Sequence, residues 1–262
     1  MSRICPLFSS SSGNSTYIAA PQGGILIDAG ASMKGICSAL ECAGGDYTEI
    51  KAVAVTHTHN DHIKGLKTFL KRTDATLIAT KATLETLRLE DKIPAGTQVK
   101  VIDGGSLDVC GMEIKNFKTS HDCQGSCGYV ITLPDGKKIS VCTDLGVVTD
   151  TVRAAIKASD VVLLESNHDI DMLKNGPYPM PLKVRILSDS GHISNLSCAA
   201  ELKGLLESGT ARFILGHLSQ QNNTPLLARS CAEAALIDIG AVNGKDYRLT
   251  VAAPQNNGVT VI

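Results

Sequence analysis

The feature that most constrains the fold is a short apolar run, residues 51–55, that leads directly into the seven polar residues 56–62. The run Lys-Ala-Val-Ala-Val is typical of a buried strand. Four potential ligands then fall within six positions, namely His57, His59, Asp61 and His62. Because three of the chain's seven histidines gather here, a merely solvated loop is a poor explanation. The pattern predicts a strand whose carboxyl end carries a metal site.

The spacing of these four residues favours two ions over one. Imidazole and carboxylate are ligands for first-row metals, and four such donors in six positions do not fit one tetrahedral ion comfortably. His57 and His59 are two apart on an extended segment, so their side chains point the same way and can share an ion. Asp61 and His62 come after the strand, where the chain turns and can reach a second ion.

Further candidate ligands stand where a predicted strand meets a loop. His121 lies in the polar loop 119–128, Asp144 follows the strand 139–143, and His217 ends the apolar stretch from 213. In open α/β structures this edge binds ligands and metals. Asp28 closes another strand, where it either caps the following turn or accepts a hydrogen bond from a metal-binding imidazole.

Apolar periodicity predicts an α/β protein with two mixed sheets and helices outside them. We expect residues 1–262 to form one domain, since this length suits one large core. Residues 9–15 read as a turn-rich loop between two strands, and residues 62–72 as one helix. The other expected strands cover 4–8, 16–20, 24–28, 77–80, 98–102, 128–133 and 138–142, with helices at 33–44, 81–91 and 149–157, and hairpins from 106 to 119.

Composition limits the partners. A net charge of −1 gives no global basic field, although four basic residues cluster after the metal motif, Lys64, Lys67, Lys71 and Arg72. They form either a solvated helix face or a patch that steers phosphates. Nine cysteines and no signal peptide indicate reduced thiols in the cytoplasm, and no apolar run is long enough to span a membrane. Cys123 and Cys127 are a weaker alternative as metal ligands.

The complete pattern resembles the metallo-β-lactamase superfamily over nearly the whole chain. His-x-His-x-Asp-His is preceded by Asp28 and followed by His121, Asp144 and His217 in the family's order. The resemblance implies a four-layer αββα sandwich with a binuclear centre at one edge. It also implies the ligand sets: His57, His59 and His121 for one ion, Asp61, His62 and His217 for the other, and Asp144 between them. The true β-lactamases usually have Cys in place of Asp144, so the resemblance is to the hydrolases.

Glu165 and His192 point to phosphodiester chemistry. Glu165 ends an apolar strand, and burying a carboxylate without a partner would cost several kcal/mol. A histidine donor would satisfy it and stay protonated. The pair resembles the Glu and His of the transfer-RNA 3′-processing nucleases and the β-CASP nucleases. That likeness implies that His192 stabilises the scissile phosphate and protonates the leaving oxygen. The alternative is that Gly191-His192 merely caps the following helix.

Several strings resemble a narrower group, the bacterial YycJ (WalJ) members of the superfamily. They include Ser11-Ser-Gly-Asn14, Gly176-Pro-Tyr-Pro179 and Leu218-Ser-Gln-Gln-Asn-Asn223. This resemblance implies a cytoplasmic DNA exonuclease that acts from the 5′ side of duplex ends with two divalent ions, Zn or Mn or else Fe. Asp61 would also orient the attacking water. Expected substrate contacts are Ser126, His168, Asn195, Asn222 and Asn223.

Three alternatives accompany this prediction. A thioesterase of the glyoxalase II type could use the same metal centre without a proton donor such as His192. A ribonuclease would use the same chemistry, but the roughly 70 residues between Asp144 and His217 are too few for a β-CASP insertion. A redox module of the di-iron flavoprotein kind would place a carboxylate at one His position of the motif and carry a flavin domain, and neither is present.

Overall fold

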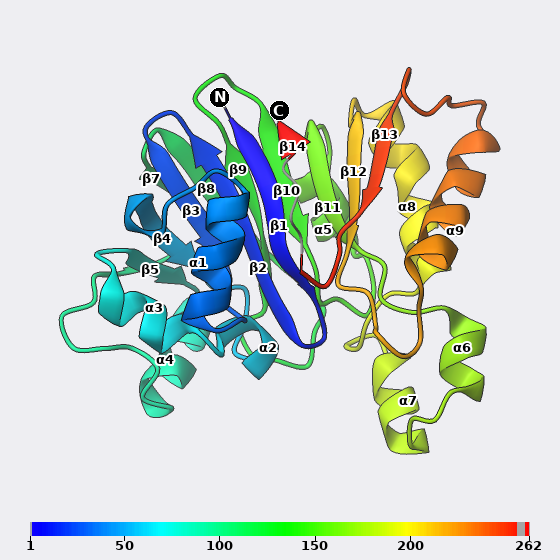
Figure 1. The fold of residues 1–262 in the computed structure, drawn as a ribbon. Coiled ribbons are helices and arrows are strands. Elements are labelled where there is room, and N and C mark those ends of the chain that lie inside the picture. Colours follow the sequence, from blue (N-terminus) through cyan, green and yellow to red (C-terminus); the bar gives the residue numbers. More distant parts are fainter. Residues whose placement is uncertain (1, 256–259, 262) are drawn as a thin grey trace.

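The apolar strands pair into two seven-stranded β-sheets that pack face to face, with helices on both outer faces (Figure 1). The structure is a computed structural model that describes residues 2–255 and 260–261. The architecture confirms the expected four-layer sandwich of the α/β class. Its two sheets are mixed, because antiparallel hairpins at one end of each sheet join parallel strands at the other.

The first sheet has the strand order β14-β1-β2-β3-β4-β5-β6. The strands from β14 to β3 are antiparallel, and those from β3 to β6 are parallel. Its strands are β1 (Arg3–Ser10), β2 (Gly13–Ala20), β3 (Gly23–Ile27), β4 (Ile50–Ala54), β5 (Thr76–Ala79), β6 (Val99–Val101) and β14 (Thr260–Val261).

The second sheet has the order β13-β12-β11-β10-β9-β8-β7. Here β7 to β10 are antiparallel and β10 to β13 are parallel. Its strands are β7 (Ser106–Val109), β8 (Met112–Lys118), β9 (Cys127–Thr132), β10 (Lys138–Cys142), β11 (Val161–Glu165), β12 (Arg212–Gly216) and β13 (Arg248–Val251).

Helices cover the outer face of each sheet. The first sheet carries α1 (Met33–Cys42), the short η1 (Tyr47–Glu49), α2 (Asn60–Ile63), α3 (Leu66–Arg72) and α4 (Lys81–Leu89). The second half of the chain contributes α5 (Asp150–Ile156), α6 (Ile170–Asn175), α7 (Met180–Ile186), α8 (Asn195–Glu207) and α9 (Pro225–Ile237). Of these, α6 and α7 project below the second sheet instead of lying on it (Figure 1).

Three apolar layers hold the sandwich together. The inner faces of both sheets form one core, which includes Ile18, Ile114 and Ile139. A second layer joins the first sheet to α1, α3 and α4 through residues such as Phe69, and a third joins the second sheet to α5, α8 and α9. The central strands are buried on both faces, which explains why they read as continuous apolar runs and not as alternating patterns.

Two expected elements were wrong in detail. Residues 9–15 are not a loop, since β1 runs to Ser10 and β2 starts at Gly13, with a tight turn between them. The helix expected over 62–72 is two helices that meet at Gly65. A side chain there would collide with the backbone oxygen of Ala31, so the chain packs too closely at this point for an unbroken amphipathic helix.

None of the helices among the described residues has both the length and the hydropathy that crossing a bilayer requires.

Candidate metal centre and active site

The candidate site lies where the carboxyl ends of the central parallel strands of both sheets meet. Asp28 follows β3 and His57 comes shortly after β4 in the first sheet. In the second sheet Asp144 follows β10, Glu165 ends β11, and His217 follows β12. The two halves of the chain therefore contribute to one site.

Three of these strand-end residues have a left-handed backbone. The φ angles are 63° at Asp28, 61° at Asp144 and 54° at His217. This conformation is uncommon for residues other than glycine, and such residues gather at functional sites. Asp28 and His217 turn the chain directly after their strands, and Asp144 does so one residue after the end of β10.

The first group of donors consists of His57, His59 and His121. The His57 Nε2 lies 3.1 Å from the His59 Nδ1, which lies 3.2 Å from the His121 Nε2. Burial lowers the pKa of all three imidazoles below the usual value. Neutral rings keep a lone pair for a metal, so this group can bind an ion without first losing protons.

The second group consists of Asp61, His62 and His217. The Asp61 Oδ2 lies 3.4 Å from the His62 Nε2 and 3.5 Å from the His217 Nε2. Asp144 lies between the groups, with Oδ2 3.3 Å from the His62 Nε2 and Oδ1 4.0 Å from the His57 Nε2. All seven side chains that the family resemblance implies as ligands therefore come together.

Charge in this second group favours a cation. Burial opposes protonation of His62 and His217, but the Asp144 carboxylate and the other acids beside them outweigh it. The pKa of His217 rises to about 10, and that of His62 lies well above its usual value. Among the described residues, the buried Asp144 Oδ2 and His217 Nε2 find no hydrogen-bond partner. A divalent ion would replace the imidazole protons and satisfy both atoms, so the donor set fits metal binding.

Hydrogen bonds to a residue outside the donor groups fix the orientation of the His62 imidazole. The Asp28 carboxylate is buried and accepts from the His62 Nδ1 at 2.7 Å and from the Thr56 backbone N and hydroxyl at 2.8 Å each. Asp28 thus braces the metal-binding segment instead of capping the following turn. Donation from Nδ1 leaves the His62 Nε2 lone pair for the centre.

Asn14 is a site residue that the sequence did not reveal. Its amide nitrogen lies 3.1 Å from the Asp61 Oδ2 and 3.0 Å from the His62 Nε2. The Ser10 backbone fixes the amide orientation from both sides, because its N donates to Oδ1 and its O accepts from Nδ2. The string Ser11-Ser-Gly-Asn14 contains this residue, but nothing local in it signals a contact with residues 47 or 48 positions away.

Glu165 holds two histidines. Its fully buried Oε1 accepts from the His192 Nδ1 at 2.8 Å and from the His217 Nδ1 at 2.7 Å. Oε2 accepts from the Leu145 and Ile193 backbone N–H groups at 3.2 Å each. The carboxylate therefore has the histidine partner that its burial demanded, and a second one besides. These contacts hold the pKa of Glu165 at about 2, against the opposing effect of burial.

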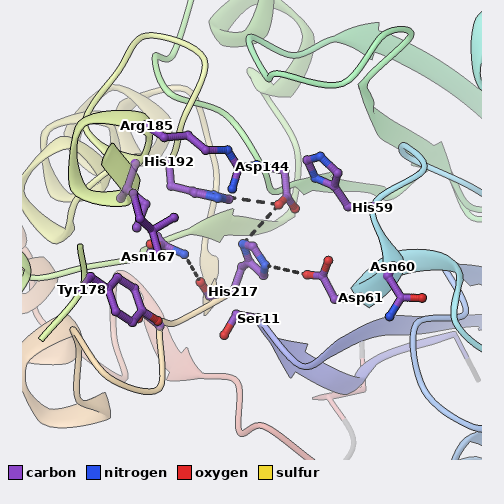
Figure 2. A pocket seen from close by; sticks show the side chains of 13 residues that line it. Ser11, His59, Asn60, Asp61, Asp144, Asn167, Tyr178, Arg185, His192 and His217 are labelled. Atoms are coloured by element: carbon purple, nitrogen blue, oxygen red, sulfur yellow. Dashed lines mark hydrogen bonds and ion pairs between the residues drawn. The ribbon is translucent and has the colours of Figure 1, made fainter. Parts of the chain in front are cut away.

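A cavity of about 330 Å³ opens beside these groups. On one side it is lined by His59, Asp61, Asp144 and His217, together with His192 (Figure 2). The cavity is also lined by Tyr178, Leu182, Arg185 and Ile186, from α7 and the loop before it, and the Arg185 side chain reaches toward Asp144 (Figure 2). Because the His192 Nδ1 donates to Glu165, its Nε2 remains for a molecule in the cavity. The residues of α7 were not predicted, since no local pattern marks them.

The residues expected to contact substrate lie elsewhere. None of Ser126, His168, Asn195, Asn222 and Asn223 lines this cavity, and all five are buried. Asn195 and Asn223 bond to each other and to Ser166, whereas the Ser126 hydroxyl bonds to Thr119. The structure gives most of their polar groups internal partners, so substrate contact by these residues stays a prediction. The basic cluster does not line the cavity either, and its Lys67 is paired with Asp91.

Comparison with known proteins agrees with this geometry. Residues 24–218 match the family model described as beta-lactamase superfamily domain. A Bacillus anthracis protein named exodeoxyribonuclease YycJ is 32% identical over 251 residues, covering 95% of this chain and 94% of the relative. The Streptococcus pneumoniae protein named exodeoxyribonuclease WalJ is 33% identical over 254 residues, covering 95% and 93%.

A solved structure shows the same fold at lower identity. The metallo-β-lactamase fold protein YhfI from Bacillus subtilis superposes with a TM-score of 0.73 at 14% sequence identity, over 99% of this chain and 98% of that one. The matched family model, the two relatives and the His and Asp donors brought together here agree. The chain therefore belongs to the metallo-β-lactamase superfamily, beside its YycJ-like members, and is a metal-dependent hydrolase.

Proposed function

We propose that this protein is a DNA exonuclease that degrades duplex DNA from the 5′ end with a binuclear metal centre. The observation that carries the proposal is the position of His192. Its ring lines the cavity beside the metal-binding donors, and Glu165 holds it from behind. A hydrolase that expels an alkoxide needs a proton donor at this place, whereas one that expels a thiolate does not. The names of the two relatives support DNA as the substrate.

The candidate metal ligands fall into two groups, and this division suits two divalent ions. His57, His59 and His121 would hold one, and Asp61, His62 and His217 would hold the other, with Asp144 shared. The two groups lie side by side, and each would hold one ion. Zinc and manganese both accept this mixture of imidazole and carboxylate, and so does iron. The nine cysteines are free, which agrees with a reducing cytoplasm as the place of action.

The chain's own residues carry the remaining chemistry. When bound, the ions supply acidity to water and positive charge to the phosphate oxygens. Asp61 borders the cavity, where its carboxylate can accept a hydrogen bond from the attacking water and orient it. His192 donates its Nε2 proton to the departing sugar oxygen. Glu165 orients that ring through the hydrogen bond that its Oε1 accepts from the His192 Nδ1.

The test is an assay on metal-free protein reloaded separately with Mn²⁺ and Zn²⁺. Substrates are end-labelled duplex DNA, single-stranded DNA, RNA and a thioester. We expect stepwise shortening of the duplex from its 5′ end. His192→Ala should slow it by about 10²–10⁴-fold, the usual contribution of a general acid. Asp144→Asn should abolish it, while Asp150→Asn, an exposed carboxylate on α5, should leave it unchanged.

Other results would reject the proposal in distinct ways. Thioester turnover that survives His192→Ala, with every nucleic acid intact, would indicate a hydrolase of the glyoxalase II type. Shortening of RNA alone would indicate a ribonuclease.

A further inference from the structure

Four of the five histidines in the two donor groups are held from outside by hydrogen bonds. In each ring one nitrogen faces the other donors, and the second is here called the outer nitrogen. The outer nitrogens of four rings have close partners, namely Thr56 for His57, Asp28 for His62, Gly191 for His121 and Glu165 for His217, at 3.0, 2.7, 3.1 and 2.7 Å in that order. Such partners fix the tautomer and the orientation of a metal-binding imidazole. The fifth ring, His59, should have one as well.

His59 differs from the other four histidines in both its orientation and its exposure. It presents Nδ1 to the centre, 3.1 Å from the His57 Nε2 and 3.2 Å from the His121 Nε2. When Nδ1 of a neutral ring binds an ion, the proton lies on Nε2, which is then a hydrogen-bond donor. The His59 side chain is 34% exposed, whereas those of the other four are at most 2% exposed. Packing alone therefore does not hold this ring, and its orientation depends on an acceptor beside Nε2.

Asp122 is the acceptor beside that nitrogen. Its Oδ1 lies 3.5 Å from the His59 Nε2 and 3.5 Å from the His121 Nε2. The first distance is slightly longer than a normal N–H···O bond of about 2.7–3.2 Å, and contacts of this kind in active sites often shorten when a ligand binds. The donor groups found among the described residues, whose atoms lie within 4.8 Å of one another, do not include Asp122. Asp122 is therefore placed to orient His59 and not to bind an ion itself.

Arg185 and the backbone fix the Asp122 carboxylate. The Arg185 Nε and Nη2 donate to its two oxygens at 2.5 and 3.0 Å, a bidentate geometry. The Asp122 N donates to the Ser190 O at 3.0 Å. Arg185 lies on α7 and extends past His192 toward Asp144 (Figure 2), so a helix from the second half of the chain supports the carboxylate. A side chain that is 29% exposed is thus held in one orientation.

The pair with Arg185 leaves Oδ1 able to accept a further hydrogen bond. This oxygen accepts one guanidinium N–H, and an ionised carboxylate oxygen has two lone pairs. A carboxylate that accepts from the outer nitrogen fixes the ring and makes the imidazole more basic as a ligand. Asp28 does this for His62, whose Nδ1 donates to it at 2.7 Å. Asp122 stands in the equivalent place for the first donor group.

We propose that Asp122, held by Arg185, is a positioning residue for the first ion. It accepts a hydrogen bond from the His59 Nε2 and so directs the Nδ1 lone pair toward the centre. This inference rests on the proposed division of the donors between two ions, and it adds that each ion depends on different outer carboxylates. The first depends on Asp122, and the second on Asp28 and Glu165.

The experiment measures the two ions separately. Metal-free protein is titrated with Zn²⁺ in a calorimeter, and His121→Ala, which lacks a ligand of the first ion, identifies the step that belongs to it. The test variants are Asp122→Ala and Asp122→Asn. Glu201→Gln is the matched control, because Glu201 makes the same bidentate pair with Arg153 and does not line the cavity. In Zn²⁺-loaded protein, ¹H–¹⁵N spectra of the histidine rings show whether the His59 Nε2 proton is protected from exchange.

We expect Asp122→Ala to weaken the first ion by about 10–100-fold and to leave the second as in the wild type. Asp122→Asn should weaken the first ion less, because an amide oxygen can still accept from the ring. Glu201→Gln should bind both ions normally. The His59 Nε2 proton should be protected in the wild type and exchange rapidly in Asp122→Ala. Urea unfolding in chelator shows whether each variant is folded, and Asp122→Asn, which keeps the size of the side chain, decides the matter if Asp122→Ala does not fold.

Two results would overturn the positioning role: Asp122 variants that bind the first ion as the wild type does, or variants that lose affinity for both ions equally. If the wild type binds one ion only and Asp122→Ala weakens it, the positioning role stands and the proposed binuclear centre fails. The titration uses no DNA, so loss of the exonuclease proposal would leave this inference intact.

Discussion

Replacing Glu165 by Gln should destabilise the protein and loosen the site at the same time. The carboxylate is fully buried, and each of its oxygens accepts two N–H groups. A glutamine has one oxygen and one NH₂ group. Whichever way the amide turns, two N–H donors face the NH₂ group and lose their acceptor. This substitution keeps the size of the side chain, so its cost reports hydrogen bonding and charge without a cavity.

The magnitude follows from those contacts. Each buried donor left without an acceptor costs about 1–3 kcal/mol, so two cost about 2–6 kcal/mol. The centre of that range, about 4 kcal/mol, is a large share of the roughly 5–15 kcal/mol by which a domain is usually stable. At about 2–4 °C for each kcal/mol, the melting temperature should fall by about 8–16 °C.

The metal centre should respond as well. Because the His217 Nδ1 donates to Glu165, its Nε2 lone pair is directed at the second donor group. If the glutamine NH₂ faces His217, the imidazole must adopt the other tautomer, which puts a proton on that Nε2. Calorimetric titration of the metal-free variant with Zn²⁺ should therefore show the second ion weakened by about 10–100-fold. The first ion, held by His57, His59 and His121, should bind as in the wild type.

Glu201→Gln is the matched control for this experiment. Glu201 accepts from Arg153 on the surface between α8 and α5, where an ion pair contributes at most about 1 kcal/mol. Urea unfolding in chelator measures both variants without any contribution from metal. A Glu165→Gln protein that unfolds within about 1 kcal/mol of the wild type would refute the reasoning. A variant that binds both ions unchanged would instead place the amide NH₂ group at the Leu145 and Ile193 N–H groups.

Two further predictions concern close packing and buried thiols. Gly30→Ala should destabilise the protein and reduce binding of the second ion, because a Cβ would collide with the Asp61 backbone oxygen and crowd the Asn14 N; unfolding and metal titration would show it, and Gly204→Ala, in open space on α8, should have no such effect. Burial raises the pKa of Cys127 to about 12, so native protein at pH 8 should resist alkylation there while the exposed Cys42 reacts. Mass spectrometry after iodoacetamide treatment measures both sites, and equal labelling would contradict this assignment of burial.

The fold was largely predictable because its strands are buried and short. Runs such as 161–164 have no competing helical period, and the structure places strands at nearly every expected position. The serine-rich residues 9–15 were wrongly predicted to form a loop, because serine, glycine and asparagine favour turns locally. Here the pairing of Ser9 with Asn14 and of Ser10 with Gly13 overrides that preference and extends the hairpin. The break at Gly65 depends on a contact with Ala31, which no local pattern reveals.

Residues of the site were predictable from the sequence only where the type of side chain and its position in the pattern both indicated a role. The sequence reveals a metal site at residues 57–62 because four potential ligands fall within six positions. It reveals Glu165 because a charged residue ends an apolar strand. Asn14 and Arg185 are ordinary residues in sequence, and they acquire a role because β2 and α7 carry them to the site from opposite halves of the chain. The second histidine on Glu165 was missed for a related reason. His217 already had a role as a ligand, so nothing in the sequence pointed to it as another partner of Glu165.

The left-handed backbone at Asp28, Asp144 and His217 limits which residue types can replace them. Asp, Asn and His tolerate this conformation better than other residues with side chains. The residue types that the backbone allows here therefore overlap with those that can bind a metal. Glutamate at position 144 would keep a carboxylate but would adopt the left-handed backbone less readily than aspartate. Cys would supply a thiolate ligand and would also adopt this backbone less readily. Each such exchange would add a backbone cost of about 1–3 kcal/mol to any change in metal affinity. The residues that this backbone tolerates best, asparagine and glycine, would remove the group that binds metal or braces the site, so the main chain and the chemistry together restrict these three positions.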